Sequence, residues 1–219
     1  MIIERRGVPT GLLTTKGFRD ALEVARQVRP QLYDYFVRKP DPLIERANRV
    51  EVEERLNSHG EVVDPLNRAQ LDAAVGKLRR NGVKSIAICF MHSYLNSSHE
   101  EAAKEAVQRL MPEAFISVSS EVLPEFREYE RMSTTVLNAY VGPRMQTYLD
   151  QFLTRMRDLG ILAEPYTIHS NGGLLSARTV AAFPVRTCLS GPAAGVGGAA
   201  VVGAAAGARE LVTFDVGGT

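Results

Sequence analysis

The stretch KSIAICFM, residues 84–91, decides the fold class, because it is apolar almost throughout. Such a run is typical of a strand that is covered on both faces, as in a parallel sheet. Shorter runs at 10–15 and 115–120 predict two further strands. Asn67 can cap a helix before the central run, and Ser97 can begin another after it. Because strands and helices alternate, the pattern predicts an α/β protein.

The other segments give further expectations of the same kind. Residues 133–159 are the longest helical stretch, bent or restarted at Pro143. In its second half the helical period predicts an inward face, formed by Met145, Tyr148, Leu149, Phe152 and Met156. The remaining predictions are a helix over 17–27, a hairpin over 48–64, strands at 166–170 and 185–189, a small-residue helix from 190, and a last strand in ELVTFDVGG.

Composition and charge exclude several classes of function. The chain has 219 residues, with 26 Lys and Arg against 25 Asp and Glu, and this balance argues against a nucleic-acid or membrane-surface role. Cys89 and Cys188 have no metal-ligand spacing and are expected to be core residues in a reduced, cytoplasmic setting. The most membrane-like stretch, 193–208, is shorter than a bilayer span.

The segment TFDVGGT, residues 213–219, has the composition of a phosphate-binding turn. Asp215 at a strand end can reach a hydrated metal ion, and Gly217 and Gly218 let backbone N–H groups approach phosphate oxygens. Thr219 adds a hydroxyl donor. Taken alone, these residues fit a plain Gly-Gly hairpin turn that binds nothing at least as well.

Two other segments can supply contacts to a ligand. Ser190 is a candidate N-cap with Pro192 in the first turn, and the exposed N–H groups there would form a weak anion site. Asn171, Gly172 and Gly173 follow a predicted strand, where substrate contacts often lie in α/β sheets. Close packing of small residues and a tight turn explain the two segments equally well.

The charged segment EFREYERMSTT, residues 125–135, carries Arg127 and Arg131 four residues apart. The spacing favours a solvated helix face with local ion pairs, with an interface or substrate role as the alternative. Of the four histidines, His92 is best placed for a cleft, but they have no carboxylate at ligand spacing, so no metal site is expected from them. The sequence shows no nucleophile elbow of the GxSxG type.

Taken together, six segments resemble successive parts of the hydantoinase A / 5-oxoprolinase family. The resemblance covers nearly the whole chain in order. The segments are RRGVPTGLLTTKGFRDALEVARQVRPQLYDY (5–35), AICFMHSYLNSSHE (87–100), EVLPEFREYERMSTTVLNAYVGP (121–143), HSNGGLLSA (169–177), VRTCLSGPAAGVGGA (185–199) and TFDVGGT (213–219).

This resemblance implies part of an actin-like ATPase (ribonuclease H-like) fold, a mixed sheet with flanking helices. It implies ATP with Mg²⁺, used to open a cyclic amide by phosphorylating the amide oxygen, and a partner subunit or domain of the hydantoinase B type. Residues 1–165 would be the end of the family's N-terminal region, and 166–219 the start of the ATPase domain. No nucleic-acid or membrane partner is implied.

The resemblance also implies where the nucleotide binds, while catalytic residues stay unassigned. The phosphate-contacting turn would be Asp215, Gly217, Gly218 and Thr219, with Asp215 reaching Mg²⁺ through water. Ser190 and Gly191 would lie near the interlobe hinge or pocket, and Asn171, Gly172 and Gly173 near the cleft.

Family members begin with a DxGGT phosphate loop and continue past the second such loop. The chain is therefore expected to be an interior fragment that is inactive alone. The first hypothesis is a fragment of an ATP-dependent hydrolase acting on hydantoin-type or 5-oxoproline-type rings. The alternatives are a subunit of an acetone carboxylase-type carboxylase and a non-catalytic truncated product. The sequence identifies neither the ring substrate nor the oligomeric state.

Overall fold

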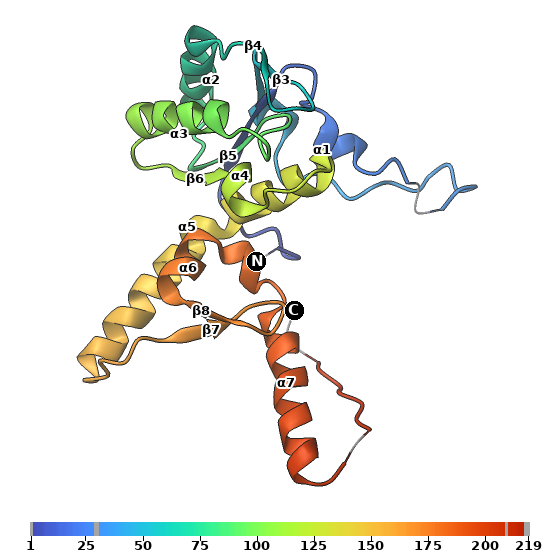
Figure 1. The fold of residues 1–219 in the computed structure, drawn as a ribbon, viewed down its shortest axis with the longest axis vertical. Helices are drawn as coiled ribbons and strands as arrows, with labels where there is room; N and C mark the ends of the chain where they lie inside the picture. Colours follow the sequence, from blue (N-terminus) through green and yellow to red (C-terminus); the bar gives the residue numbers. More distant parts are fainter. Residues whose placement is uncertain (1, 29–30, 209, 217–219) are drawn as a thin grey trace. The chain divides into compact units, whose positions relative to one another are not determined.

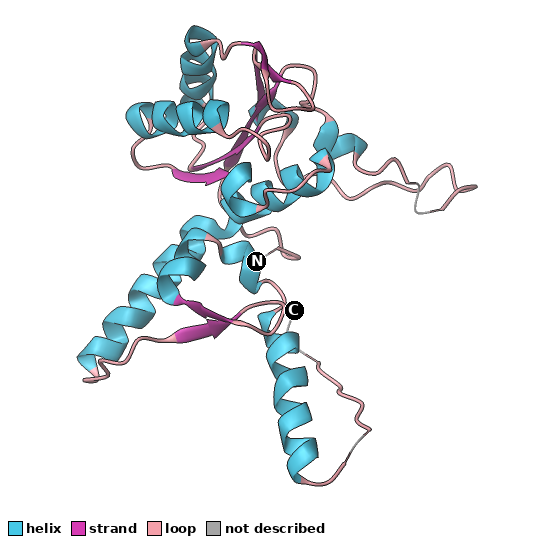
Figure 2. Cartoon of the chain, in the orientation of Figure 1, coloured by secondary structure: helices cyan, strands magenta, loops and turns pink. Residues whose placement is uncertain are grey.

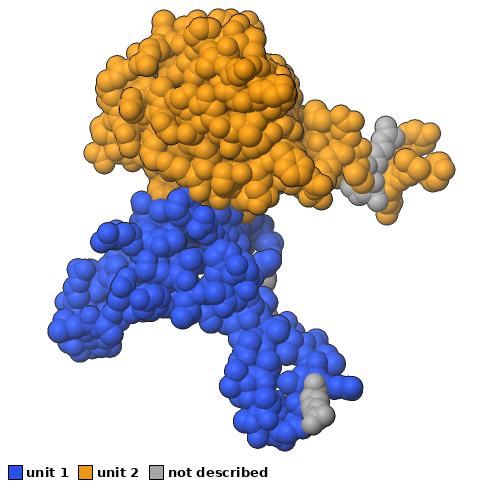
Figure 3. Space-filling view, viewed as in Figure 1, with its two compact units in different colours: residues 1–4, 144–219 blue, residues 5–143 orange. Residues whose placement is uncertain are grey.

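The structure, a computed structural model, describes residues 2–28, 31–208 and 210–216. The chain divides into two compact units, which Figure 3 shows in orange and blue. The first unit, orange and marked unit 2 in the key of Figure 3, comprises residues 5–143. The second, blue and marked unit 1, comprises residues 1–4 and 144–219.

A four-stranded parallel sheet forms the centre of the first unit, in the order β2-β1-β5-β6 (Figure 2). The strands are β1 (Thr10–Thr15), β2 (Arg49–Val52), β5 (Ser85–Cys89) and β6 (Phe115–Val118). All residues of β1 and β5 are buried, which confirms the prediction from the apolar run at 84–91. Such burial on both faces is what an all-parallel sheet requires.

Helices cover both faces of this sheet, since successive strand residues point to opposite sides. Leu13, Ile86 and Ile88 pack with α2 (Arg68–Arg80) and α3 (Ser98–Leu110) in one core. On the other face the core contains side chains of α1 (Ala21–Val24) and of the first part of α5 (Glu128–Asp158). Its strand residues are Leu12, Ala87 and Cys89. The α/β class with a parallel sheet and flanking helices is thus confirmed.

Asn67 caps α2 as predicted: its side-chain oxygen accepts a hydrogen bond from the Gln70 N–H at 3.1 Å. We expect Asn67→Ala to lower the free energy of unfolding by about 1 kcal/mol, because an N–H of the first turn loses its acceptor. Urea denaturation measures the change. Asn67→Ser, which keeps an acceptor, should stay close to the wild type, and equal losses in both variants would contradict the capping explanation.

The hairpin predicted over 48–64 is only partly correct. Its first half is β2, which pairs in parallel with β1, so Val50 and Val52 contribute to the main sheet. The antiparallel pair is formed instead by β3 (Arg55–Leu56) and β4 (Val62–Asp64). The parallel pairing depends on a partner about forty residues earlier, which local alternation cannot reveal. Two short helices complete this unit, η1 (Arg46–Asn48) and α4 (Ser119–Val122).

Two glycines of this unit face aromatic rings at very short range. A Cβ atom on Gly7 would lie 2.2 Å from the Tyr140 ring, and one on Gly142 would lie 2.3 Å from the Phe115 ring. Neither distance is possible between real atoms, so the rings occupy the space that a side chain would need.

The second unit is smaller. The second half of α5 packs on α6 (Ala177–Ala182) through Leu149, Ala177 and Val180. A two-stranded antiparallel sheet, β7 (Tyr166–Ile168) and β8 (Leu174–Ser176), precedes α6. The 3₁₀ helix η2 (Pro184–Thr187) leads into α7 (Ser190–Ala205). Residues 210–216 then turn back along α7 (Figure 1), and the Leu211 side chain lies against Gly203.

Several predicted elements were wrong. The helix over 17–27 is limited to the four residues of α1, and 185–189 is largely a 3₁₀ turn that Pro184 begins. Residues 210–216 are irregular and not a strand. Helix α5 begins earlier than predicted and runs without a break past Pro143, and Tyr148 and Phe152 on it are exposed.

Within residues 2–28, 31–208 and 210–216, no helix is both long and apolar enough to cross a lipid bilayer.

Candidate functional site

Ser170 joins two of the segments that the sequence singled out. Its N–H and its hydroxyl both donate to the Arg186 carbonyl at 2.8 Å. Its hydroxyl oxygen also accepts from the Leu189 N–H at 3.0 Å. Because Leu189 is the residue before α7, Ser170 fixes the end of β7 against the start of that helix.

The turn that follows Ser170 contains the three predicted cleft residues. The Gly173 N–H donates to the Asn171 side-chain oxygen at 3.0 Å, and the Gly172 N–H donates to the His169 carbonyl at 2.8 Å. Gly172 has a φ of +89°, a conformation in which glycine is favoured. The turn is therefore a β7–β8 hairpin loop with an internal hydrogen-bond pattern.

Ser190 and Gly191 are the first two residues of α7. Leu189 holds the cap position, so the prediction of Ser190 as the N-cap was wrong by one residue. Leu189 has no polar side chain, which leaves the first-turn N–H groups without side-chain capping. The space over Gly191 is open, since an added Cβ would meet nothing within 4 Å. Through Ser170 and Leu189, the structure links the loop that contains residues 171–173 to the start of α7.

Asp215 is exposed in the irregular segment 210–216. Three other predicted phosphate-contacting residues, Gly217, Gly218 and Thr219, lie outside the described residues. The role of this turn in binding a nucleotide therefore stays a prediction.

The carboxyl edge of the four-stranded sheet carries buried polar side chains that the sequence did not single out. Glu54, just after β2, has a fully buried side chain, and one of its oxygens lies 2.8 Å from His99 Nδ1. The Thr15 hydroxyl donates to the other oxygen and accepts from the Met91 N–H at 2.9 Å. This chain of contacts links the ends of β1, β2 and β5 to α3. The sequence signal was the polar residue at each strand end.

A second buried carboxylate, Glu100, holds the ends of β5 and β6. It accepts hydrogen bonds from the Phe90 N–H at 2.9 Å, the Ser119 hydroxyl at 2.6 Å and the Ser120 N–H at 2.9 Å. The three donors satisfy both oxygens of a carboxylate that has no exposed surface.

Arg131 is completely buried, so the prediction of a solvated helix face was wrong for this residue. Its guanidinium donates through Nη2 to the Phe90 carbonyl at 2.8 Å and through Nη1 to the Glu125 carbonyl at 3.1 Å. It also lies 5.2 Å from the Tyr94 ring centroid. The Phe90 backbone therefore lies between the two charges: its N–H donates to Glu100 and its carbonyl accepts from Arg131.

A polar cavity of about 470 Å³ opens beside this edge of the sheet. Lys16 and Glu53 form an ion pair of 2.7 Å on its wall. This contact raises the pKa of the Lys16 ammonium and lowers the pKa of the Glu53 carboxyl. The lining residues are Thr15, Lys16, Glu53, Glu54, Arg55, Asp64, Pro65 and Asn67.

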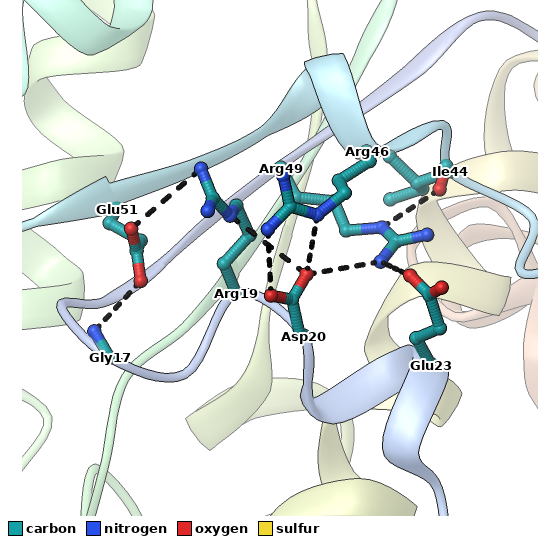
Figure 4. A network of polar contacts seen from close by, with 8 residues as sticks. All are labelled: Gly17, Arg19, Asp20, Glu23, Ile44, Arg46, Arg49 and Glu51. Carbon is teal, nitrogen blue, oxygen red and sulfur yellow. Dashed lines mark hydrogen bonds and ion pairs between the residues drawn. The ribbon is translucent and has the colours of Figure 1, made fainter.

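An ionic network ties the loop after β1 to the start of β2 (Figure 4). The Arg46 guanidinium binds both oxygens of Asp20, at 3.0 and 2.9 Å, and lowers the pKa of that carboxyl. Buried Arg49 donates to Glu23 at 2.9 Å. Three arginines face three carboxylates, so the network is balanced in charge and its role is structural. They are Arg19, Arg46 and Arg49 with Asp20, Glu23 and Glu51.

The two cysteines differ in accessibility. Burial raises the pKa of the Cys89 thiol to about 11. Partial desolvation also raises the pKa of Cys188, but this residue is exposed. The prediction that both are core residues is therefore wrong for Cys188. We expect iodoacetamide at about pH 8 to label Cys188 alone in the folded chain, and both thiols in urea, because only the thiolate reacts. Peptide mass spectrometry measures the labelling, and rapid modification of Cys89 without denaturant would contradict the burial.

In the part of the chain that the structure describes, no three His, Cys, Asp or Glu side chains gather closely enough to hold a metal ion.

Two regions of the chain match known protein families. Residues 1–111 match the hydantoinase/oxoprolinase N-terminal region, and residues 131–219 match the hydantoinase/oxoprolinase domain. The division at residue 165 expected from the sequence stays a prediction.

Curated relatives are similar along the chain but much longer. Caprolactamase subunit alpha of Pseudomonas jessenii is 34% identical over 100% of this chain, which covers 32% of that protein. 5-oxoprolinase 1 of Arabidopsis thaliana is 30% identical over 100% of this chain, which covers 18% of that protein. The chain thus spans at most about a third of these two relatives.

Two solved structures share the fold. The crystal structure of ATP-dependent caprolactamase from Pseudomonas jessenii has a TM-score of 0.84 at 33% identity, over 100% of this chain and 32% of that one. Nucleotide-free acetone carboxylase, from work on ATP-dependent acetone carboxylation, has a TM-score of 0.83 at 25% identity. That match covers 94% of this chain and 30% of the other. These neighbours are consistent with the expected actin-like ATPase type of fold.

Proposed function

The chain belongs to the hydantoinase/oxoprolinase family, and from this premise we propose that it forms part of an ATP-dependent subunit that hydrolyses cyclic amides. The observation that carries the proposal is the similarity over the whole chain to a caprolactamase described as ATP-dependent. The substrate class is a ring amide of the hydantoin or 5-oxoproline type.

The corner around Ser170 fits a phosphate-bearing ligand. The N–H groups of the first turn of α7 have no side-chain cap, and the positive end of the helix dipole favours an anion there. Gly172 and Gly191 have open space over their Cα atoms, so a ligand can approach the backbone closely. In the proposed site Asn171 and Gly173 would contact the ligand beside them, and Ser190 would contribute its hydroxyl.

Asp215, Gly217, Gly218 and Thr219 would hold the other side of the phosphates, and Asp215 would reach Mg²⁺ through a water molecule. Bound ATP would supply the phosphoryl group that activates the amide oxygen. A hydantoinase B-type partner is part of the proposal, and the α subunit designation of the caprolactamase relative supports a multi-subunit enzyme.

The test uses the complete polypeptide that contains this chain, together with its hydantoinase B-type partner, ATP and Mg²⁺. Hydantoin, 5-oxoproline and caprolactam are supplied in turn, and ADP release is measured against a reaction without substrate. Release that depends on one of these rings is expected. If none of them stimulates ADP release, the hydrolase proposal fails.

The second candidate is a subunit of a carboxylase, favoured by the likeness to acetone carboxylase over 94% of the chain. The same assay separates the two, because a carboxylase would release ADP with acetone and bicarbonate and not with a lactam.

A further inference from the structure

Three buried polar atoms at one end of the sheet lack a hydrogen-bond partner among the described residues. They are Thr14 Oγ1, His92 Nδ1 and Arg131 Nε. Thr14 is 1% exposed and Arg131 is fully buried. Buried polar groups are nearly always paired, and each unpaired group costs free energy. Three such atoms need an explanation.

Two of the three side chains converge on Cys89. Thr14 lies directly opposite Cys89 in the parallel register of β1 and β5, so both side chains point to the face that α5 covers. The Arg131 guanidinium, which comes from α5, lies near the Cys89 thiol and opposes the rise in its pKa. Thr14, from the sheet, and Arg131, from the helix that covers this face, therefore both lie beside the Cys89 thiol.

The third side chain, His92, comes from the turn that follows β5. Its ring centroid lies 6.2 Å from that of Tyr94, the ring over which the Arg131 guanidinium is placed. His92 has a φ of +58°, which a non-glycine residue rarely adopts. This conformation costs free energy, and such strain concentrates at functional positions. His92 is half-buried, so it forms the accessible side of the group.

The charge of Arg131 indicates the kind of ligand. Within the described residues no carboxylate lies at ion-pair distance from it, and its partners are the Phe90 and Glu125 carbonyls and the Cys89 thiol. The Phe90 backbone lies between Glu100 and Arg131. The Glu100 oxygens accept from the Phe90 N–H, the Ser119 hydroxyl and the Ser120 N–H. A buried cation without a direct counter-ion is costly. Arg131 also lies near the N-terminus of α5, where the helix dipole adds positive potential.

We propose that Thr14, His92 and Arg131 form a binding site for a small oxyanion, with bicarbonate and inorganic phosphate as the planar and tetrahedral forms to be tested. The Arg131 Nε–H and the Thr14 hydroxyl donate to the anion, and His92 donates through Nδ1 when that nitrogen carries a proton. The site lies in the unit of residues 5–143, and it does not depend on the function proposed above.

A single buried water molecule is the competing explanation, since it could also pair with these atoms. The two explanations differ in one measurable respect. A water site gives no saturable response to added oxyanion, whereas an anion site does.

Thr14→Val is the variant that tests the site. Valine has nearly the same shape, and no protein hydrogen bond is lost because Thr14 Oγ1 has no partner among the described residues. Thr10→Val is the control, on the same strand and face but at the other end. It removes the hydrogen bond from the Thr10 hydroxyl to the Val8 carbonyl, so circular dichroism verifies its fold before the titration. Arg131→Lys is the second variant. It keeps the charge and removes the Nε–H, but it also removes the two donors to the Phe90 and Glu125 carbonyls, so circular dichroism verifies its fold before the titration.

Isothermal titration calorimetry of the chain with bicarbonate, and separately with phosphate, is carried out at constant ionic strength in chloride. We expect saturable binding of at least one oxyanion. Thr14→Val and Arg131→Lys should each weaken it by about tenfold or more, as for loss of a hydrogen bond to a charged group, and Thr10→Val should not.

The preferred anion identifies the ligand as planar or tetrahedral. Absence of saturable binding at millimolar concentrations overturns the proposal in favour of water. Binding that is unchanged in both test variants overturns it as well, because the anion would then bind elsewhere. Thermal melting of Thr14→Val should show no loss of stability, which separates an effect on binding from an effect on folding.

Discussion

Replacing Asp215 by asparagine in the complete subunit is expected to reduce substrate-dependent ADP release by about 100-fold or more. In the proposed site the carboxylate orients the water shell of Mg²⁺ beside the phosphates, and an amide lacks the charge to do so. The side chain is exposed in this chain, so the change should leave folding unaffected.

Glu210→Gln is the matched control, because it removes a carboxylate from the same irregular segment. It should retain ADP release within about twofold, as is usual for an exposed side chain away from a site. The measurement is the initial rate at saturating ATP, with circular dichroism to verify folding. An Asp215→Asn enzyme as active as the wild type would remove the phosphate-binding role from this residue.

Glu100→Gln should be the most destabilising of the conservative changes considered, by about 3 kcal/mol. The carboxylate accepts from Phe90, Ser119 and Ser120, and an amide would direct an N–H group at one of these donors. Loss of the negative charge would also leave the positive charge of buried Arg131 less well balanced.

The neighbouring Glu101 provides the control, because it is exposed and lies in the same turn of α3. Glu101→Gln should change the free energy of unfolding by no more than about 0.5 kcal/mol. Both values come from urea denaturation followed by circular dichroism. A similar small change in both variants would show that Glu100 is not the charge that holds the ends of β5 and β6.

The sequence predicted the elements whose signals are local. The apolar run at 84–91, the cap at Asn67 and the helix that begins after Ser97 all have the expected structure. Each depends on a period or a capping group within a few residues, and these features persist whatever the rest of the chain does.

The elements that were missed depend on distant partners. Val50 and Val52 alternate as in a hairpin, yet β2 pairs with β1. Residues 210–216 have a strand-like sequence but no strand partner among the described residues. Strand formation requires a neighbour to supply hydrogen bonds, and a local pattern does not identify it.

The buried polar residues were missed for a related reason. Arg131 lies in a segment of alternating charges, which is typical of an exposed helix. The buried position is tolerated because the guanidinium donates hydrogen bonds to the Phe90 and Glu125 carbonyls. The loop that contains residues 171–173 is linked to Leu189, just before α7, through Ser170, and the ligand contacts of both segments stay a prediction.

Glycine-to-alanine exchanges are expected to have opposite effects on the thermal stability of this chain, depending on the position of the glycine. At Gly7 and Gly142 the usual exchange for alanine would force an aromatic ring out of place. Gly195, Gly197 and Gly198 lie within α7, where an added methyl group meets nothing within 4 Å. There each alanine should raise thermal tolerance by restricting the unfolded chain, at about 0.5–1 kcal/mol per exchange. A set of variants designed for thermal stability should therefore change the glycines of α7 and keep Gly7 and Gly142.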